Sequence, residues 1–149
     1  MKAHVTRSSG SSLDIEICTQ DVTQTFRASV GILIDCAHRW RSLIIRDHVD
    51  GTAFSILLRH MQHNAFPSLT HVSVEYVPSH LGDRLSRFYS ERCPHLQHLD
   101  LGRGFIRSLN FPPPPSLTSL ACGFGNGNPA SILPRLTPEA HNALTLWIS

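Results

Sequence analysis

The chain has 149 residues, a net charge of +2 with its histidines neutral, and 16% charged residues, against about 25% in an average globular protein. This length allows one domain with a sizeable core, and the composition excludes a chain that is disordered throughout. The small net charge argues against nucleic-acid binding, and no apolar run approaches the roughly 20 residues of a membrane helix. Four cysteines without a Cys-x-x-Cys pair suit a reducing compartment. We therefore expect an intracellular protein, cytoplasmic or nuclear, that contacts neither nucleic acid nor membrane.

The first expected element is a strand over residues 13–17, where apolar and acidic side chains alternate. It follows a polar, serine-rich segment, residues 1–11, which we expect to be disordered. Apolar residues then recur at helical spacing from Phe26 to Ala37, with Asp21 or Thr23 as the N-cap. The chain therefore opens with a strand followed by an amphipathic helix.

The pattern apolar-x-x-apolar-x-apolar occurs four times later in the chain, and its first positions lie 29, 27 and 21 residues apart. Three of the four copies have proline two residues before the first apolar position, which fixes the backbone ahead of a strand. A fixed pattern at this spacing predicts repeated strands. The four segments are Trp40–Ile45, Leu69–Val74, Leu96–Leu101 and Leu117–Cys122.

The connections between these strands change in character along the chain. Apolar residues at helical spacing predict a helix ending near Met61, capped by Asp50 or Thr52, and another opening at Pro78 with Leu81, Leu85, Phe88 and Tyr89 facing inward. The proline run 112–115 forbids a helix and predicts an extended return. A glycine-rich loop starts at Gly123, Pro138 suits a helix start, and residues 144–148 alternate like a strand, so the last ten residues are ambiguous between helix and strand.

Units of one strand plus one return predict an α/β fold, namely a short, irregular leucine-rich-repeat-like solenoid of parallel strands with helical or extended returns. We expect residues 12–122 to form this domain. Residues 123–149 are expected to hold the glycine-rich loop and an irregular C-terminal unit.

Three sequence phrases carry a family resemblance: Ala37–Leu43, Phe66–Leu69 and Cys93–Leu101. They resemble the irregular leucine-rich-repeat regions of F-box-type proteins, a group expanded in mushroom-forming fungi, over roughly residues 12 to 122. The resemblance implies substrate recognition for ubiquitin ligation, with a protein partner of unknown identity.

Two features of that family are missing from the sequence. One is the F-box, an N-terminal Leu-Pro-x-Glu-like helical hairpin that docks on the adaptor of a cullin–RING ligase. The other is the Asn or Cys expected three residues after the last strand Leu, where His48, Val77, Gly104 and Gly125 stand instead. We expect the recognition half without its ligase-docking half, so that assembly with a ligase requires an F-box supplied elsewhere.

The sequence contains only weak candidates for a catalytic, metal or cofactor site. His60 and His63 make at most half a metal site, Cys93 stands at a helix–strand junction, and the glycines near Arg103 lack the third glycine and following helix of a dinucleotide fingerprint. No pair of carboxylates has a spacing specific to acid–base work. We expect no enzyme, no catalytic residue, no metal and no cofactor.

The expected binding surface is the uncovered face of the sheet, because residues between the inward apolar positions must point the other way. The interpretation is a non-enzymatic protein-interaction module with modest, pH-sensitive affinity. The alternatives are a truncated α/β enzyme domain, a degenerate fragment without selected function, and a sheet face that is merely solvated. The candidate partner-binding residues are Asp14, Glu16, Ile44, Arg46, His71, Ser73, Glu75, His98 and Asp100.

Overall fold

The computed structural model describes residues 11–18, 24–46, 51–77, 85, 89, 91–104, 115–122 and 145–148. Within these residues the chain forms six strands, two α-helices and one short 3-10 helix. The strands are β1 (Leu13–Ile17), β2 (Trp40–Ile45), β3 (His71–Val77), β4 (His98–Gly104), β5 (Ser119–Cys122) and β6 (Thr145–Ile148). The helices are α1 (Gln24–Asp35), the 3-10 helix η1 (Ala37–Arg39) and α2 (Gly51–Met61).

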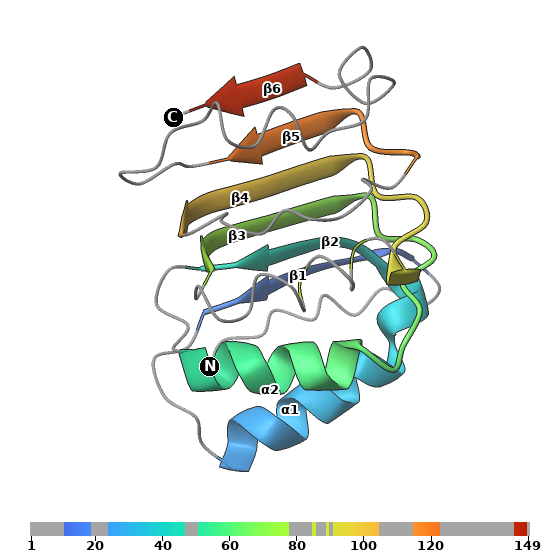
Figure 1. The fold of residues 1–149 in the computed structure, drawn as a ribbon. Helices are drawn as coiled ribbons and strands as arrows, with labels where there is room; N and C mark the ends of the chain where they lie inside the picture. Colours follow the sequence, from blue (N-terminus) through green and yellow to red (C-terminus); the bar gives the residue numbers. More distant parts are fainter. Residues whose placement is uncertain are drawn as a thin grey trace.

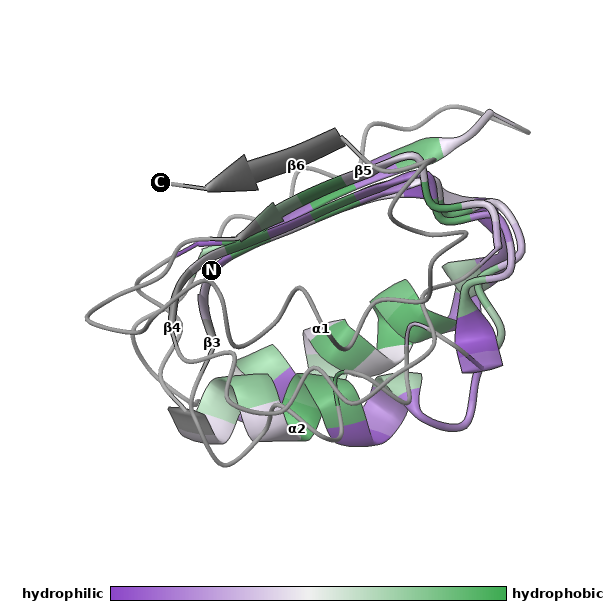
Figure 2. Cartoon of the chain, turned by 45° about the horizontal axis from the view of Figure 1, so that its top comes forward, coloured by the Kyte–Doolittle hydropathy of each residue, from purple (hydrophilic) through white to green (hydrophobic). Residues whose placement is uncertain are grey.

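The six strands form one open sheet in chain order, β1-β2-β3-β4-β5-β6, and every neighbouring pair is parallel (Figure 1). Helices α1 and α2 lie together on one side of this sheet (Figure 2). The predicted α/β class and the parallel strand pairing are therefore confirmed. The last residues are also settled, because Thr145–Ile148 is a strand that pairs with β5.

In three of its four copies, the apolar pattern begins two residues before the strand that it predicts, whereas the first copy and β2 both begin at Trp40. Leu69 and Leu96 lie in the turns ahead of β3 and β4, where their amides donate to the carbonyl oxygens of Phe66 and Cys93 over 3.2 Å. Proline at the second position favours such a turn. These leucines are buried, so the predicted starts of β3, β4 and β5 are wrong by two residues, the predicted start of β2 at Trp40 is confirmed, and the predicted core positions hold.

The core lies between the sheet and the two helices. Parallel register stacks each inward residue on its neighbour, so one column holds Ile15, Leu43, Val72, Leu99 and Leu120, each at most 3% exposed. Burying one such side chain contributes about 1.5–3 kcal/mol. Below the column pack the apolar stripes of the helices, Phe26, Val30 and Leu33 from α1 and Phe54, Leu57 and Leu58 from α2.

Trp40 joins these layers. It is fully buried, its ring lies 5.1 Å from that of Phe66 between centroids, and its indole nitrogen donates to the carbonyl oxygen of Leu33 over 3.1 Å. A single residue at the start of β2 thereby holds the sheet, a turn and α1 together.

The helix predictions are confirmed in outline. Ala37 falls in η1, beyond the end of α1, and Thr52 lies inside α2. Leu85 and Tyr89 are helical and buried, as expected for the third helix. The proposed caps Asp21, Thr23 and Asp50, residues 78–84, 86–88 and 90 of that helix, residues 112–114 of the proline run, and the segments 1–10 and 123–144 lie outside the described residues.

A side-chain ladder joins the turns that precede the strands. Each rung is a hydrogen bond between neighbouring units. The donor is the side chain just before the first buried residue of one unit, and the acceptor is a backbone carbonyl in the turn of the preceding unit. The positions of the missing Asn or Cys follow the strands, so this ladder joins a different set of turns and does not replace those side chains. Its rungs are Arg39 Nη2 to Ser11 O (2.8 Å), Ser68 Oγ to His38 O (2.8 Å) and Ser116 Oγ to Pro94 O (2.9 Å).

Candidate functional site

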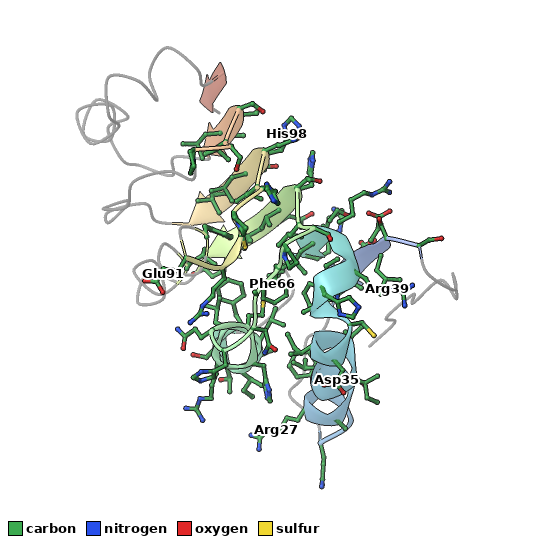
Figure 3. All side chains as sticks on the ribbon, turned by 90° about the vertical axis from the view of Figure 1, so that its right-hand side faces the viewer. Arg27, Asp35, Arg39, Phe66, Glu91 and His98 are labelled. Atoms are coloured by element: carbon green, nitrogen blue, oxygen red, sulfur yellow. The ribbon has the colours of Figure 1, made fainter. Side chains whose placement is uncertain are left out.

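The nine predicted site residues all lie on the face of the sheet that turns away from α1 and α2, here called the open face. Figure 3 shows His98 projecting from β4 on the side away from α1, which carries Arg27 and Asp35. In the described part of the chain no helix covers this face (Figure 2). Register aligns its side chains in two rows, Asp14–Ser42–His71–His98–Ser119 and Glu16–Ile44–Ser73–Asp100–Ala121.

At one end of the first row, Arg41 binds Asp14. The pairing of β1 with β2 shifts between Leu13 and Asp14, which leaves Arg41 as an extra residue in β2. Its guanidinium makes a bidentate contact with the Asp14 carboxylate, and Ser42 Oγ donates to the same carboxylate over 2.8 Å. These hydrogen bonds, from Arg41 first and Ser42 second, lower the pKa of Asp14. Neither Arg41 nor Ser42 is among the site residues predicted from the sequence.

Arg46 bridges two carboxylates just beyond the end of β2. Its Nε donates to Glu16 Oε1 over 2.7 Å, and its Nη1 donates to Glu75 Oε1 over 2.5 Å. These contacts, that with Glu75 first, raise the pKa of the guanidinium. The three side chains are between 36% and 52% exposed, so solvent screens each pair and its contribution to stability is small. The bridge orders side chains from β1 and β3 on one surface.

The middle of the open face holds an imidazole pair beside a carboxylate. The rings of His71 and His98 lie 4.6 Å apart between centroids and are tilted by 37°. Burial lowers the pKa of His71, the His98 ring lowers it further, and Asp100 opposes both effects. Asp100 is exposed and accepts a 3.3 Å hydrogen bond from Ser73 Oγ. Ile44 lies part-buried among these polar groups.

The residues considered as weak metal-binding, nucleophilic or nucleotide-binding candidates do not form a common site with the polar groups of the open face. His60 and His63 are exposed near the end of α2, and the described residues hold no group of three or more metal-ligating side chains. Cys93 is fully buried, and burial raises the pKa of its thiol far above the usual range, which disfavours the nucleophilic thiolate. The segment Gly102–Gly104, expected to follow a strand, is itself the end of β4.

Comparison of the chain with models of protein families, with curated proteins and with solved structures finds no match. Among the described residues, no helix is both long enough and apolar enough to cross a membrane. The function is therefore argued from the geometry of the open face.

Proposed function

We propose that the chain is a non-enzymatic protein-interaction module that docks a partner protein on the open face of its sheet. One observation carries this proposal: the described strands have an apolar face that packs on α1 and α2, and a polar face that no described helix covers. Strands buried on both faces, as in doubly wound enzymes, are apolar throughout. Here polar side chains alternate with apolar ones, which favours a surface left available for binding.

We further propose that the architecture is a short leucine-rich-repeat-like solenoid. Three features support it: the strictly sequential parallel strands, the position of both helices on one side of the sheet, and the ladder between successive turns. Each feature arises when one structural unit is stacked on the next. In such a solenoid, the distance between neighbouring strands sets the distance between the side chains of the open face that would contact a partner.

The resemblance to F-box-type proteins extends the proposal to substrate recognition for a ubiquitin ligase, with the F-box supplied by another chain or segment. Lys2 is the only lysine in the sequence. Ubiquitin carried to such a complex therefore has its side-chain acceptors mainly on the partner. Mass spectrometry of ubiquitin–lysine linkages in the assembled complex tests this extension, which fails if the partner stays unmodified.

The docking proposal is tested by comparing two triple variants in a proximity-labelling capture from cell lysate. The face variant replaces Arg46, Glu75 and Asp100 with Ala. The control variant replaces Arg27, Asp35 and Glu91, which are exposed and lie outside the open face. Both variants remove one guanidinium and two carboxylates, so their change in net charge is identical.

Circular dichroism and thermal melting first establish that both variants fold. We expect the face variant to lose an identified partner that the wild type and the control variant both retain. Loss in the control variant together with retention in the face variant would place the binding surface on the helices and overturn the proposal. Equal capture by all three proteins would also overturn it.

A further inference from the structure

The carboxylates of the open face differ in whether they form an ion pair with an arginine. Three of the four described carboxylates on it are held by a guanidinium of this chain, Asp14 by Arg41 and both Glu16 and Glu75 by Arg46. The fourth, Asp100, makes no ion pair with any described side chain; its carboxylate accepts a 3.3 Å hydrogen bond from Ser73 and acts on His71 through its charge. In the row Glu16–Ile44–Ser73–Asp100–Ala121, the negative charge of Glu16 is therefore paired with an arginine of the described chain, and that of Asp100 is not.

The surroundings of Asp100 suit a planar cation better than a point charge. The imidazole pair His71–His98 occupies the adjacent row of the same two strands, about 6.6 Å away along the strand direction. A guanidinium can donate two hydrogen bonds to one carboxylate and also stack on an aromatic face, whereas an ammonium group has no plane to stack. The carboxylate and the two rings thus present both kinds of contact side by side.

We propose that Asp100, with the His71 and His98 rings beside it, forms a docking site for an arginine side chain of the partner protein. The site deepens the proposed docking function, on which its biological use rests, by naming what the partner presents. The partner's guanidinium would complete for Asp100 the contact that Arg41 and Arg46 make for the other three carboxylates.

Protonation of His71 should oppose this docking. The charged and titratable groups in the two rows are Asp100 on β4, the Asp14–Arg41 pair beyond Ser42, and Glu16 beyond Ile44, while Ser119 on β5 is neutral. Asp100 is thus the carboxylate next to the imidazole pair. The imidazolium form of His71 would compete with the guanidinium for Asp100 and repel it, so affinity should fall as the pH drops below 6.5 toward the lowered pKa of His71.

The experiment is a nuclear magnetic resonance titration of the full chain with Nα-acetyl-arginine amide, following the imidazole signals of His71 and His98. The citrulline and lysine analogues test whether charge and planarity are both needed. Asp100→Asn removes the proposed acceptor. Asp35→Asn, an identical change at an exposed position of α1, is the matched control.

We expect saturable shifts of both imidazoles with the arginine probe, unchanged in Asp35→Asn, weakened about fivefold or more in Asp100→Asn, and absent with citrulline. Equal affinity in Asp100→Asn and Asp35→Asn would overturn the site, and so would equal affinity for the lysine or citrulline probe. The citrulline comparison uses the wild-type chain, so it decides the matter even if a variant unfolds.

The outcome is separable from that of the proposed function. Arginine binding at Asp100 with partner capture that ignores the open face would retain the site and reject the docking function. Partner capture that requires the open face but gives no arginine response would retain the function and reject the site.

Discussion

The two faces of the sheet differ in the side chains that they carry: apolar and buried on the core face, mostly polar and partly exposed on the open face. On the core face, residues such as Leu43, Val72 and Leu99 stack in register and are almost completely buried. On the open face, the rows between them hold guanidinium–carboxylate pairs, an imidazole pair and hydroxyl groups that remain partly exposed. Burial of apolar area contributes far more to stability than exposed ion pairs do, so the core face specifies the fold and the open face is free to vary.

The largest expected effect comes from the core face at Trp40. Trp40→Ala removes a fully buried indole, its contact with Phe66 and its hydrogen bond to Leu33, and should lower the free energy of unfolding by about 3–5 kcal/mol. Urea unfolding followed by circular dichroism measures it. Arg41→Ala, at the next and exposed position, should lower the free energy of unfolding far less, because solvent screens its ion pair with Asp14. Equal losses at the two positions would contradict the distinction between the faces.

The next effect concerns the space beside the backbone at two glycines. Replacing each with alanine should change the stability of the fold in opposite directions. A Cβ atom at Gly102 would lie 2.6 Å from the carbonyl oxygen of Glu75, so Gly102→Ala should destabilise the chain by about 1–3 kcal/mol. At Gly31 in α1 nothing lies within 4 Å of the added atom, so Gly31→Ala should stabilise by about 0.5–1 kcal/mol. Thermal melting of both variants checks this, and melting shifts of the same sign would refute it.

A smaller effect is expected at the edge where the two faces meet, in the ladder between turns. Ser68→Ala removes the hydrogen bond to His38 O and should cost about 0.5–1.5 kcal/mol. Ser12→Ala, at an exposed position ahead of β1, should change stability by less than about 0.5 kcal/mol. Urea midpoints of the two variants decide whether the rung stabilises the fold, and a Ser68→Ala midpoint no lower than that of Ser12→Ala would show that it does not.

The smallest effect is on the open face and depends on pH. The pKa of His71 is lower in the folded chain than its ordinary value of 6.5, first because of burial and then because of His98. The unfolded chain therefore binds more protons below pH 6.5, and stability should fall as pH drops through that value toward the folded pKa. Urea midpoints at pH 7.5 and pH 5.5 measure the fall, which His71→Gln should reduce and His63→Gln should leave intact. A fall of the same size in His71→Gln would exclude this source.

Much of the core could be predicted because alternation and helical spacing are local properties of the sequence. The inward positions of β1 to β5 and the buried stripe of α2 follow from these periods. The strand starts at His71 and His98 could not, because the preceding Leu69 and Leu96 are equally apolar and only the turn hydrogen bonds separate turn from strand.

The open face was predicted as a set of residues but not as a set of contacts. Asp14 and Glu16 were expected to be available to a partner, yet each already binds an arginine of the chain. The role of Arg41 had a visible signal: Leu13 and Ile15 are two residues apart, whereas the equivalent Trp40 and Leu43 are three apart, so one extra residue must bulge. The Arg46 bridge had no such signal, since it depends on the three-dimensional approach of side chains from separate strands.

The central claim, that a partner binds the open face and leaves the helices uncovered, is tested most directly by thiol labelling in the bound complex. In a chain with Cys18 and Cys36 replaced by Ser, Ser73→Cys reports on the open face and Ala28→Cys on the exposed side of α1. The partner captured by the wild type should slow maleimide labelling at position 73 and leave position 28 unaffected. Protection at position 28 with undiminished labelling at position 73 would contradict the account.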